Sequence, residues 1–268
     1  LNGEDGTLAG VMRLSKIAFA SPGLFPSSAA MDKYFTKLTL KGIGVETLPY
    51  VKMNRINYVK KREFAAKYVS KRLSYPVIVK PANLGSSIGI SMAKNGLTLN
   101  AALDNAFRYD DKVIVEKALT DFREINCACI KLGDKYLVSE CEEPMTSGEI
   151  LSFSDKYSGE RKAVFPAELD GKIASKIKDL TSYIYRKLEF SGAVRIDYLL
   201  DGEKIYVNEI NSVPGSLAYY LFVDSIGEFR ELLLRSIELA EEEESDRENN
   251  VYTYSSNVLS LDSEKLRK

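Results

Sequence analysis

The chain contains no histidine, only three cysteines and no long hydrophobic run. Without histidine, Ser-His-Asp and Cys-His catalysis are excluded, and carboxylates, lysines, tyrosines and metal ions remain as the available chemistry. The cysteines, Cys127, Cys129 and Cys141, lack the spacing of a zinc site, and we expect them to be buried thiols of a reducing compartment. No stretch approaches the roughly 18 consecutive apolar residues of a membrane-spanning helix, and no signal peptide opens the sequence, so we expect a cytoplasmic protein without a membrane partner.

Neither sign of charge dominates the sequence. The 37 basic residues nearly balance the 38 acidic ones, which argues against a nucleic-acid partner and leaves any phosphate chemistry to local lysines. The 268 residues are 45% hydrophobic, enough for a sizeable core, and the prior of about 150 residues per domain predicts roughly two units. Since the first residue is Leu1 rather than methionine, we expect the natural beginning to lie upstream.

Hydrophobic periodicity and turn residues predict a mixture of helices and strands. Helices are expected at 7–17, 27–44, 61–73, 98–110, 171–189 and 228–246. Strands are expected at 47–53, 76–82, 90–95, 112–119, 191–200 and 204–211, with a hairpin between Arg123 and Cys141 that turns at LGDK. Residues 142–169 have no sustained period and are expected to be mostly loop, which at this length is uncommon unless functional or disordered.

Polar residues alternate on the last two predicted strands. A three-residue loop at 201–203 would pair these strands so that Arg195 lies opposite Glu209 and all odd-numbered positions, Val207 included, share one face. Asp197, Glu209 and Asn211 would then present hard oxygen ligands of the kind that magnesium prefers beside phosphate. A two-residue loop would instead put the two sets on opposite faces, and a simple wet sheet face is the alternative interpretation.

Two lysines are candidates for phosphate binding. Lys80 lies on a buried strand that is followed by the loop Gly85 to Gly89, whose backbone N–H groups can bind phosphate oxygens, although a plain turn is the alternative. Lys33 is a second candidate, with an exposed helical residue as its alternative. The end of the strand at Glu116 and Lys117 would expose backbone groups able to bind an adenine edge.

Together and in this order, nine segments resemble the ATP-grasp superfamily and, within it, the D-alanine:D-alanine ligases. They are NGEDGTLAG, SSAAMDKYFTK, PVIVKPANLGSSIG, VIVEKAL, REINCACI, SDKYSG, FPAEL, GAVRIDYLL and KIYVNEINSVPGS. The resemblance implies an α+β chain with the ATP-grasp fold, in which two α+β subdomains enclose a nucleotide cleft. It implies the remnant of an N-terminal α/β domain at 1–28, a central subdomain at 29–120, a C-terminal subdomain at 121–245 with a lid loop at 143–165, and an extension at 246–268.

The implied activity is the ATP-dependent joining of two D-alanine molecules through an acyl phosphate, for peptidoglycan precursor synthesis. The extension VYTYSSNVL resembles the branch that includes the vancomycin-resistance D-alanine:D-serine ligases, so D-serine is an alternative second substrate. A nucleotide-binding relic without ligase activity is a further alternative, because the family's N-terminal glutamate and His-Gly are absent. Full-length relatives are expected to form homodimers through the first domain, much of which this sequence lacks.

The resemblance also implies roles for individual residues. Those expected to bind ATP are Lys33 and Lys80 for the phosphates, Glu116, Lys117 and Leu119 for adenine, Glu124 for the ribose and Lys156 for the γ-phosphate. Two magnesium ions, with manganese as an alternative, are expected at Asp197, Glu209 and Asn211.

Four residues are expected to act on the amino-acid substrates. Arg195 and the backbone N–H of Gly215 would stabilise the tetrahedral oxyanion. Tyr157 would close the lid over the second substrate, and Ser86 belongs to the hydrogen-bonded group that positions this tyrosine. Tyr220 stands where the family often has a serine that contacts the second substrate's carboxylate.

Overall fold

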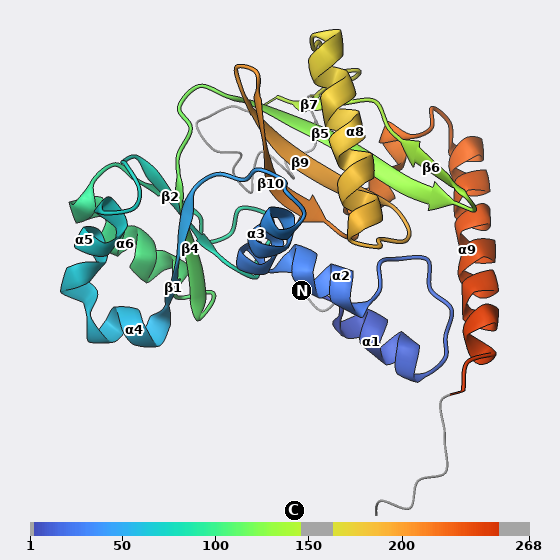
Figure 1. Ribbon diagram of the computed structural model, residues 1–268, viewed down its shortest axis with the longest axis horizontal. Helices are drawn as coiled ribbons and strands as arrows, with labels where there is room; N and C mark the ends of the chain where they lie inside the picture. The colour runs from blue at the N-terminus through green and yellow to red at the C-terminus, as the bar shows by residue number, and fades with distance from the viewer. Residues whose placement is uncertain (1–2, 146–162, 252–268) are drawn as a thin grey trace, which may run out of the picture.

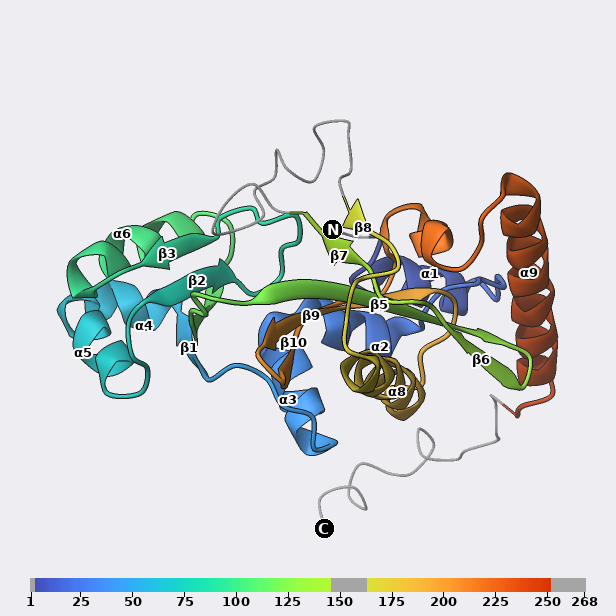
Figure 2. The ribbon, with the colours of Figure 1, turned by 90° about the horizontal axis from the view of Figure 1, so that it is seen from above.

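The computed structural model describes residues 3–145 and 163–251, which form two main antiparallel β-sheets with helices packed against them (Figure 1, Figure 2). The first sheet has the order β1-β4-β2-β3 and consists of β1 (Tyr50–Asn54), β2 (Val77–Pro81), β3 (Ser91–Ala93) and β4 (Lys112–Lys117). Its helices are α4 (Arg55–Lys60), α5 (Ala65–Ser70) and α6 (Gly96–Ala106). Val79 and Val115 are buried in the core beneath them, so the alternating positions Lys80 and Glu116 lie on the other face of the sheet.

The second sheet has the order β10-β9-β5-β6. Its strands are β5 (Arg123–Leu132), β6 (Lys135–Val138), β9 (Val194–Asp201) and β10 (Lys204–Asn211), and a small separate sheet pairs β7 (Glu143–Pro144) with β8 (Ala163–Val164). Helix α8 (Gly171–Lys187) crosses one face, and α9 (Ile226–Glu248) lies beside β6 (Figure 1). Ile184 of α8 is buried with Ile196 and Tyr198 of β9, so Asp197 lies on the face turned away from α8.

The N-terminal part of the chain forms three helices, α1 (Thr7–Leu14), α2 (Leu24–Met31) and α3 (Lys33–Gly42). The single helix predicted at 27–44 is therefore wrong, because the chain leaves the helical conformation at Asp32, where φ is −85° and ψ is 106°. The Asp32 carboxylate accepts hydrogen bonds from the N–H groups of Tyr34 at 2.9 Å and Phe35 at 3.1 Å, so it caps a new helix. This break sets the direction of α3 and of the lysines on it.

A second departure concerns the helix predicted at 61–73. The chain instead forms the 3-10 turn η1 (Arg62–Phe64) and the short α5, and the preceding α4 was not predicted. Tyr58 of α4 is buried in the core of the first sheet. This residue lies before the segment 61–73, so the hydrophobic period of that segment gave no sign of α4. The other predicted helices and strands are present within a few residues of their expected ends.

The β9–β10 hairpin differs from the predicted register. Lys204 pairs with Asp201, so the loop has two residues instead of three. Continued without a break, this register would place the polar residues of the two strands on opposite faces. The register shifts between Val207 and Glu209, where Asn208 is the extra residue of a β-bulge.

The bulge brings the polar residues of the two strands to one face. Beyond it, Glu209 pairs with Asp197 and Asn211 pairs with Arg195, so the predicted pairing of Arg195 with Glu209 is wrong. Val207 is also not on the predicted face, because it is buried in the core with Tyr198. A bulge of one residue thus produces the convergence that we expected from a loop of odd length.

The prediction of buried thiols is confirmed for Cys127, Cys129 and Cys141, which are free and lie in the core of the second sheet. Within residues 3–145 and 163–251, no helix is both long enough and apolar enough to span a bilayer.

Candidate functional site

Helix α3 presents two lysines one turn apart on the same face. The ammonium group of Lys33 donates a hydrogen bond to the carbonyl oxygen of Leu84 and lies 3.9 Å from the Glu209 carboxylate. Lys33 is only 8% exposed, so the interpretation as an exposed helical residue is wrong. Lys33 therefore connects α3, the loop after β2 and the polar end of β10.

Lys37, the other lysine of this face, belongs to a buried group of three charges. Its Nζ lies 2.5 Å from one carboxylate oxygen of Glu116, and the Nζ of Lys80 lies 2.5 Å from the other. Burial by itself would raise the pKa of Glu116, but the ammonium groups of Lys37 and Lys80 outweigh it and lower this pKa to about 2. Glu116 is thus an ionised carboxylate at neutral pH, and its charge opposes the effect of burial, which lowers the pKa of Lys37.

Lys80 also joins the two sheets. Its ammonium donates a 3.1 Å hydrogen bond to the Oδ1 of Asn208, the bulge residue of β10. The two residues are 128 positions apart in the chain. The bulge therefore places a polar side chain of the second sheet against the lysine of the first.

The loop between β2 and β3 has a constrained backbone. Ser86 and Ser87 have φ angles of 55° and 58°, in the left-handed region, and Gly89 has a φ of 73°. A Cβ atom at Gly89 would lie 2.7 Å from the Tyr109 ring, so only glycine fits at this turn. Asp110 holds the start of the loop by accepting bonds from the backbone N–H of Asn83 at 2.8 Å and from its side chain at 3.0 Å.

The polar face of β9 and β10 contains a connected set of charged and amide groups. Arg195 donates two hydrogen bonds to Asp197, at 2.7 and 2.9 Å, and the Nδ2 of Asn211 donates to the same carboxylate at 3.0 Å. Burial lowers the pKa of Arg195, but the Asp197 carboxylate and the Tyr220 hydroxyl raise it by more, so the guanidinium stays charged.

This face has the donor types for a divalent cation. Among the described residues no group of three or more His, Cys, Asp or Glu side chains is arranged to hold a metal, and the candidate set is two carboxylates and one amide. Asp197, Glu209 and Asn211 supply oxygen atoms, which suit magnesium or manganese. Because both Asp197 oxygens accept hydrogen bonds from Arg195, a cation there would share this carboxylate with the arginine.

The segment after β10 has an unusual backbone. The turn η2 (Gly215–Leu221) contains Ser216, Leu217 and Ala218 with φ angles of 52°, 53° and 50°. Such angles cost roughly 1–2 kcal/mol for a residue with a side chain, and they occur preferentially at binding sites. A Cβ atom at Gly215 would meet no atom of residues 3–145 or 163–251 within 4 Å, so packing against these residues does not require glycine there.

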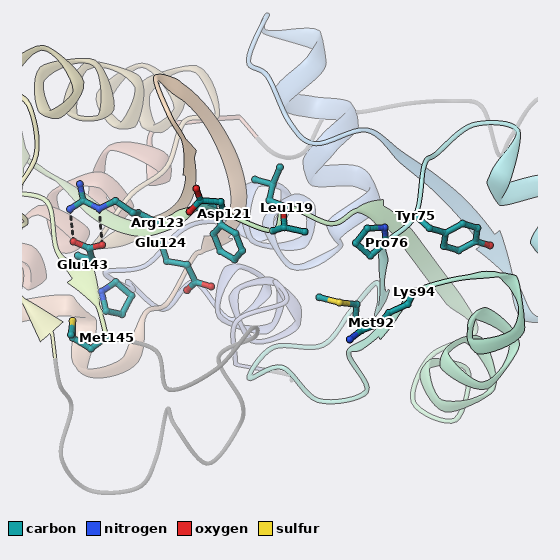
Figure 3. A pocket seen from close by; sticks show the side chains of 13 residues that line it. Tyr75, Pro76, Met92, Lys94, Leu119, Asp121, Arg123, Glu124, Glu143 and Met145 are labelled. Carbon is teal, nitrogen blue, oxygen red and sulfur yellow. Dashed lines mark hydrogen bonds and ion pairs between the residues drawn. The ribbon is translucent and has the colours of Figure 1, made fainter.

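A cavity of about 640 Å³ lies where the two sheets meet (Figure 3). Its walls are Tyr75, Pro76, Met92 and Lys94 on the side of the first sheet, the linker 119–122, and Arg123, Glu124, Glu143, Pro144 and Met145 on the side of the second. Figure 3 shows Glu124 between the paired Arg123 and Glu143 on one side and Leu119 on the other. Pro76 precedes β2, so Lys80 lies four residues further along the strand, about 13 Å from Pro76, and Met92 of the cavity wall pairs with Ile78 between them.

Comparison with known proteins agrees with this arrangement. The family model described as the D-ala D-ala ligase C-terminus matches residues 39–229. A D-alanine–D-alanine ligase of Thermosipho africanus is 37% identical over 270 residues, which cover 98% of this chain and 72% of the relative. The chain belongs to the D-alanine–D-alanine ligase family.

Solved structures of the family have the same fold. A D-alanine-D-alanine ligase from Helicobacter pylori superimposes with a TM-score of 0.73 at 32% identity, covering 88% of this chain and 67% of that one. The VanG D-Ala:D-Ser ligase from Enterococcus faecalis gives a TM-score of 0.76 at 30% identity, covering 89% and 70%. The expected α+β class and ATP-grasp fold are confirmed.

Two predicted family residues have contacts that differ from expectation. Glu116 was expected to bind adenine, but its carboxylate is held by Lys37 and Lys80, and its backbone lies within the ladder between β1 and β2, opposite Tyr50 and Ile78. The strand end was expected to have unpaired N–H groups, but those of Lys117 and Ala118 donate to the Pro49 and Pro76 carbonyls, both at 3.0 Å. Of the predicted adenine-binding residues, Leu119 is the one that lines the cavity.

Lys37 and Asn208 are site residues that were not predicted. The spacing of Lys37 from Lys33 was an available signal, because residues four apart share a helix face. No local signal indicates that Asn208 is a bulge residue. Lys156 and Tyr157 lie outside the described residues, so their roles and that of Ser86 beside Tyr157 stay predictions.

Proposed function

We propose that this chain is an ATP-dependent ligase that joins two D-alanine molecules; its relatives are named D-alanine–D-alanine ligases. The observation that carries the proposal is that one lysine of α3 and one of the first sheet meet polar side chains of β10 in the second sheet. Lys33 lies 3.9 Å from Glu209, and Lys80 bonds to Asn208 at 3.1 Å. Cationic and anionic groups held at this distance suit a triphosphate with its metal ions.

The cavity supports a position for the nucleoside. Leu119 and Met92 offer apolar contact to an adenine ring, and Glu124 offers a carboxylate to the ribose hydroxyls. With the base there, the phosphates would extend along β2 toward Lys80 and Lys33, and the loop 85–89 would lie over them. Lys156 is proposed to contact the γ-phosphate.

Asp197, Glu209 and Asn211 are proposed to hold two magnesium ions, which would neutralise phosphate charge during transfer. The chain's own contribution here is orientation. Arg195 orients the Asp197 carboxylate through two hydrogen bonds. The bulge at Asn208 places Glu209 and Asn211 on the same face of the sheet as Asp197.

The proposed reaction has two steps. The carboxylate of the first D-alanine attacks the γ-phosphorus of ATP, which forms an acyl phosphate and releases ADP. The amine of the second D-alanine then attacks the carbonyl carbon, and phosphate leaves with the peptide bond formed. Arg195 and the N–H of Gly215 would stabilise the negative charge on the carbonyl oxygen, and Tyr157 would exclude water.

D-serine is the alternative second substrate, since one structural relative is named a D-Ala:D-Ser ligase. The test is phosphate release by the full chain with ATP and magnesium, using D-alanine alone and D-alanine with D-serine, at several pH values. Mass spectrometry of the products identifies the dipeptide. We expect D-alanyl-D-alanine from D-alanine alone. Indifference of phosphate release to both amino acids would leave only nucleotide binding.

A further inference from the structure

Glu116 and its two lysines make a buried group whose composition is not explained by stability. Glu116 is 2% exposed, Lys37 is 3% exposed and Lys80 is 8% exposed. Burying charges costs solvation free energy that their mutual attraction often only offsets, and apolar residues in their place are frequently as stable. Three charges buried together beside a proposed binding cleft therefore suggest a role in binding.

The three charges are not equivalent. Lys80 reaches across to Asn208 in the second sheet, so it borders the space between the sheets. Lys37 is enclosed by Glu116 and by the ring of Tyr50, whose centroid lies 5.3 Å from its Nζ. With a side chain only 4% exposed, Lys37 has no access to a bound molecule.

The net charge of the group depends on Lys37. Glu116 and Lys80 alone would form a neutral pair, and a phosphate nearby would experience little attraction from it. The carboxylate has two oxygens, and each holds one ammonium group at 2.5 Å. With Lys37 on the second oxygen, the group has one net positive charge, and Lys80 is the member that reaches toward the second sheet.

We infer that Lys37 is a positioning residue for nucleotide phosphates, which balances the charge of Glu116 so that Lys80 is both held in place and left with a net positive charge. This inference rests on the proposed nucleotide site. An ammonium group has three N–H donors, and Lys80 directs two of them to Glu116 and Asn208. The third is available to a phosphate oxygen, in a direction that the two anchors fix.

The inference predicts effects on the phosphates and none on the nucleoside. The full chain would be studied by calorimetry with magnesium and either ADP or adenosine, for the unmodified protein, Lys37→Met, Glu116→Gln and the double variant. Lys37→Met leaves Glu116 and Lys80 as a neutral pair, and we expect binding of ADP to weaken by about tenfold while adenosine binding is unchanged. Lys41→Met is the matched control, since Lys41 lies one turn further along α3 and is exposed.

The double variant separates a charge effect from a structural one. Lys37→Met with Glu116→Gln removes one charge of each sign and restores one net positive charge, so we expect ADP affinity to return to within about threefold of the unmodified chain. Glu116→Gln alone should bind ADP at least as tightly as the unmodified chain. If Lys37→Met does not fold, these two variants carry the test, and weaker ADP binding by both would overturn the inference.

The other outcomes are also decisive. Equal losses of ADP and adenosine binding in Lys37→Met, or a double variant as weak for ADP as the single one, would show a structural role only and overturn the inference. A chain that binds ADP more tightly than adenosine in every variant alike would overturn the inference and leave the proposed function standing. An unmodified chain that binds neither ADP nor adenosine would overturn both.

Discussion

Glu209 lies directly opposite Asp197 on the β9–β10 hairpin, although the two-residue loop of this hairpin would by itself place them on different faces. The bulge at Asn208 reverses the alternation of β10 between the loop and the polar residues. The facing of the candidate metal ligands therefore depends on the bulge, which takes Asn208 out of the ladder.

Deletion of Asn208 tests the bulge residue itself. Without it the ladder continues regularly, with Glu209 still opposite Asp197 and Asn211 still opposite Arg195, but Lys80 loses its hydrogen bond to the second sheet. We expect the chain to stay folded and ligase turnover to fall by about tenfold, since a hydrogen bond to a charged group contributes about 1.5–3 kcal/mol. Circular dichroism in urea and phosphate release measure the two effects. Asn208→Ala keeps the bulge but removes the same hydrogen bond, so its turnover should fall as well, and unchanged turnover in both variants would contradict the role of Asn208.

Glu209→Gln tests the carboxylate itself. The substitution keeps the shape of the side chain but removes its charge, so we expect turnover to fall below detection while the melting temperature changes little. Glu203→Gln, at the exposed loop of the same hairpin, is the matched control and should behave like the unmodified chain. Turnover that is unchanged in Glu209→Gln would remove Glu209 from the proposed metal site.

Stability at acidic pH should depend on Glu116. Its pKa falls from 4.5 to about 2 in the folded chain, because Lys37 and Lys80 outweigh the opposing effect of burial. A carboxyl group with a lowered folded-state pKa contributes stability above pH 4.5 and loses it as the pH falls toward 2. The expected loss is on the order of 3 kcal/mol of unfolding free energy across this window.

The measurement is urea unfolding at a series of pH values for the unmodified chain and for Glu116→Gln. Other carboxyl groups contribute to both proteins, so the difference between the two curves reports Glu116. We expect the unmodified chain to lose stability more steeply below pH 4.5 than the variant does. Parallel curves would show that Glu116 is not held as an ionised group by its lysines.

Arg195→Lys tests the proposed stabilisation of the oxyanion. Arg195 makes two parallel hydrogen bonds to Asp197, and lysine cannot reproduce this planar geometry. We expect kcat to fall by about 100-fold, the usual effect of losing one such donor, with a smaller change in the KM for ATP. Arg186→Lys, on the exposed face of α8, is the control. A kcat within threefold of the unmodified value would place Arg195 outside the reaction.

The local elements could largely be predicted from the sequence. The buried strand that contains Lys80 and the amphipathic α8 follow from hydrophobic periodicity, which depends only on neighbouring residues. The break between α2 and α3 at Asp32 was not predicted. Aspartate is a common helix-capping residue, and the Asp32 carboxylate accepts the N–H of Phe35, but the apolar pattern continues on both sides of it. Tertiary packing of α2 and α3 decided between one helix and two.

The site divides in the same way. The sequence by itself determined which oxygen-bearing and cationic residues were present and that a helix face carried both Lys33 and Lys37, because these are properties of residue type and local period. Only the tertiary structure decided that Glu116 serves two lysines and that Asn208 turns Glu209 toward Asp197. Such contacts join positions far apart in the chain, and their geometry depends on how two sheets pack and on where one strand departs from its alternation.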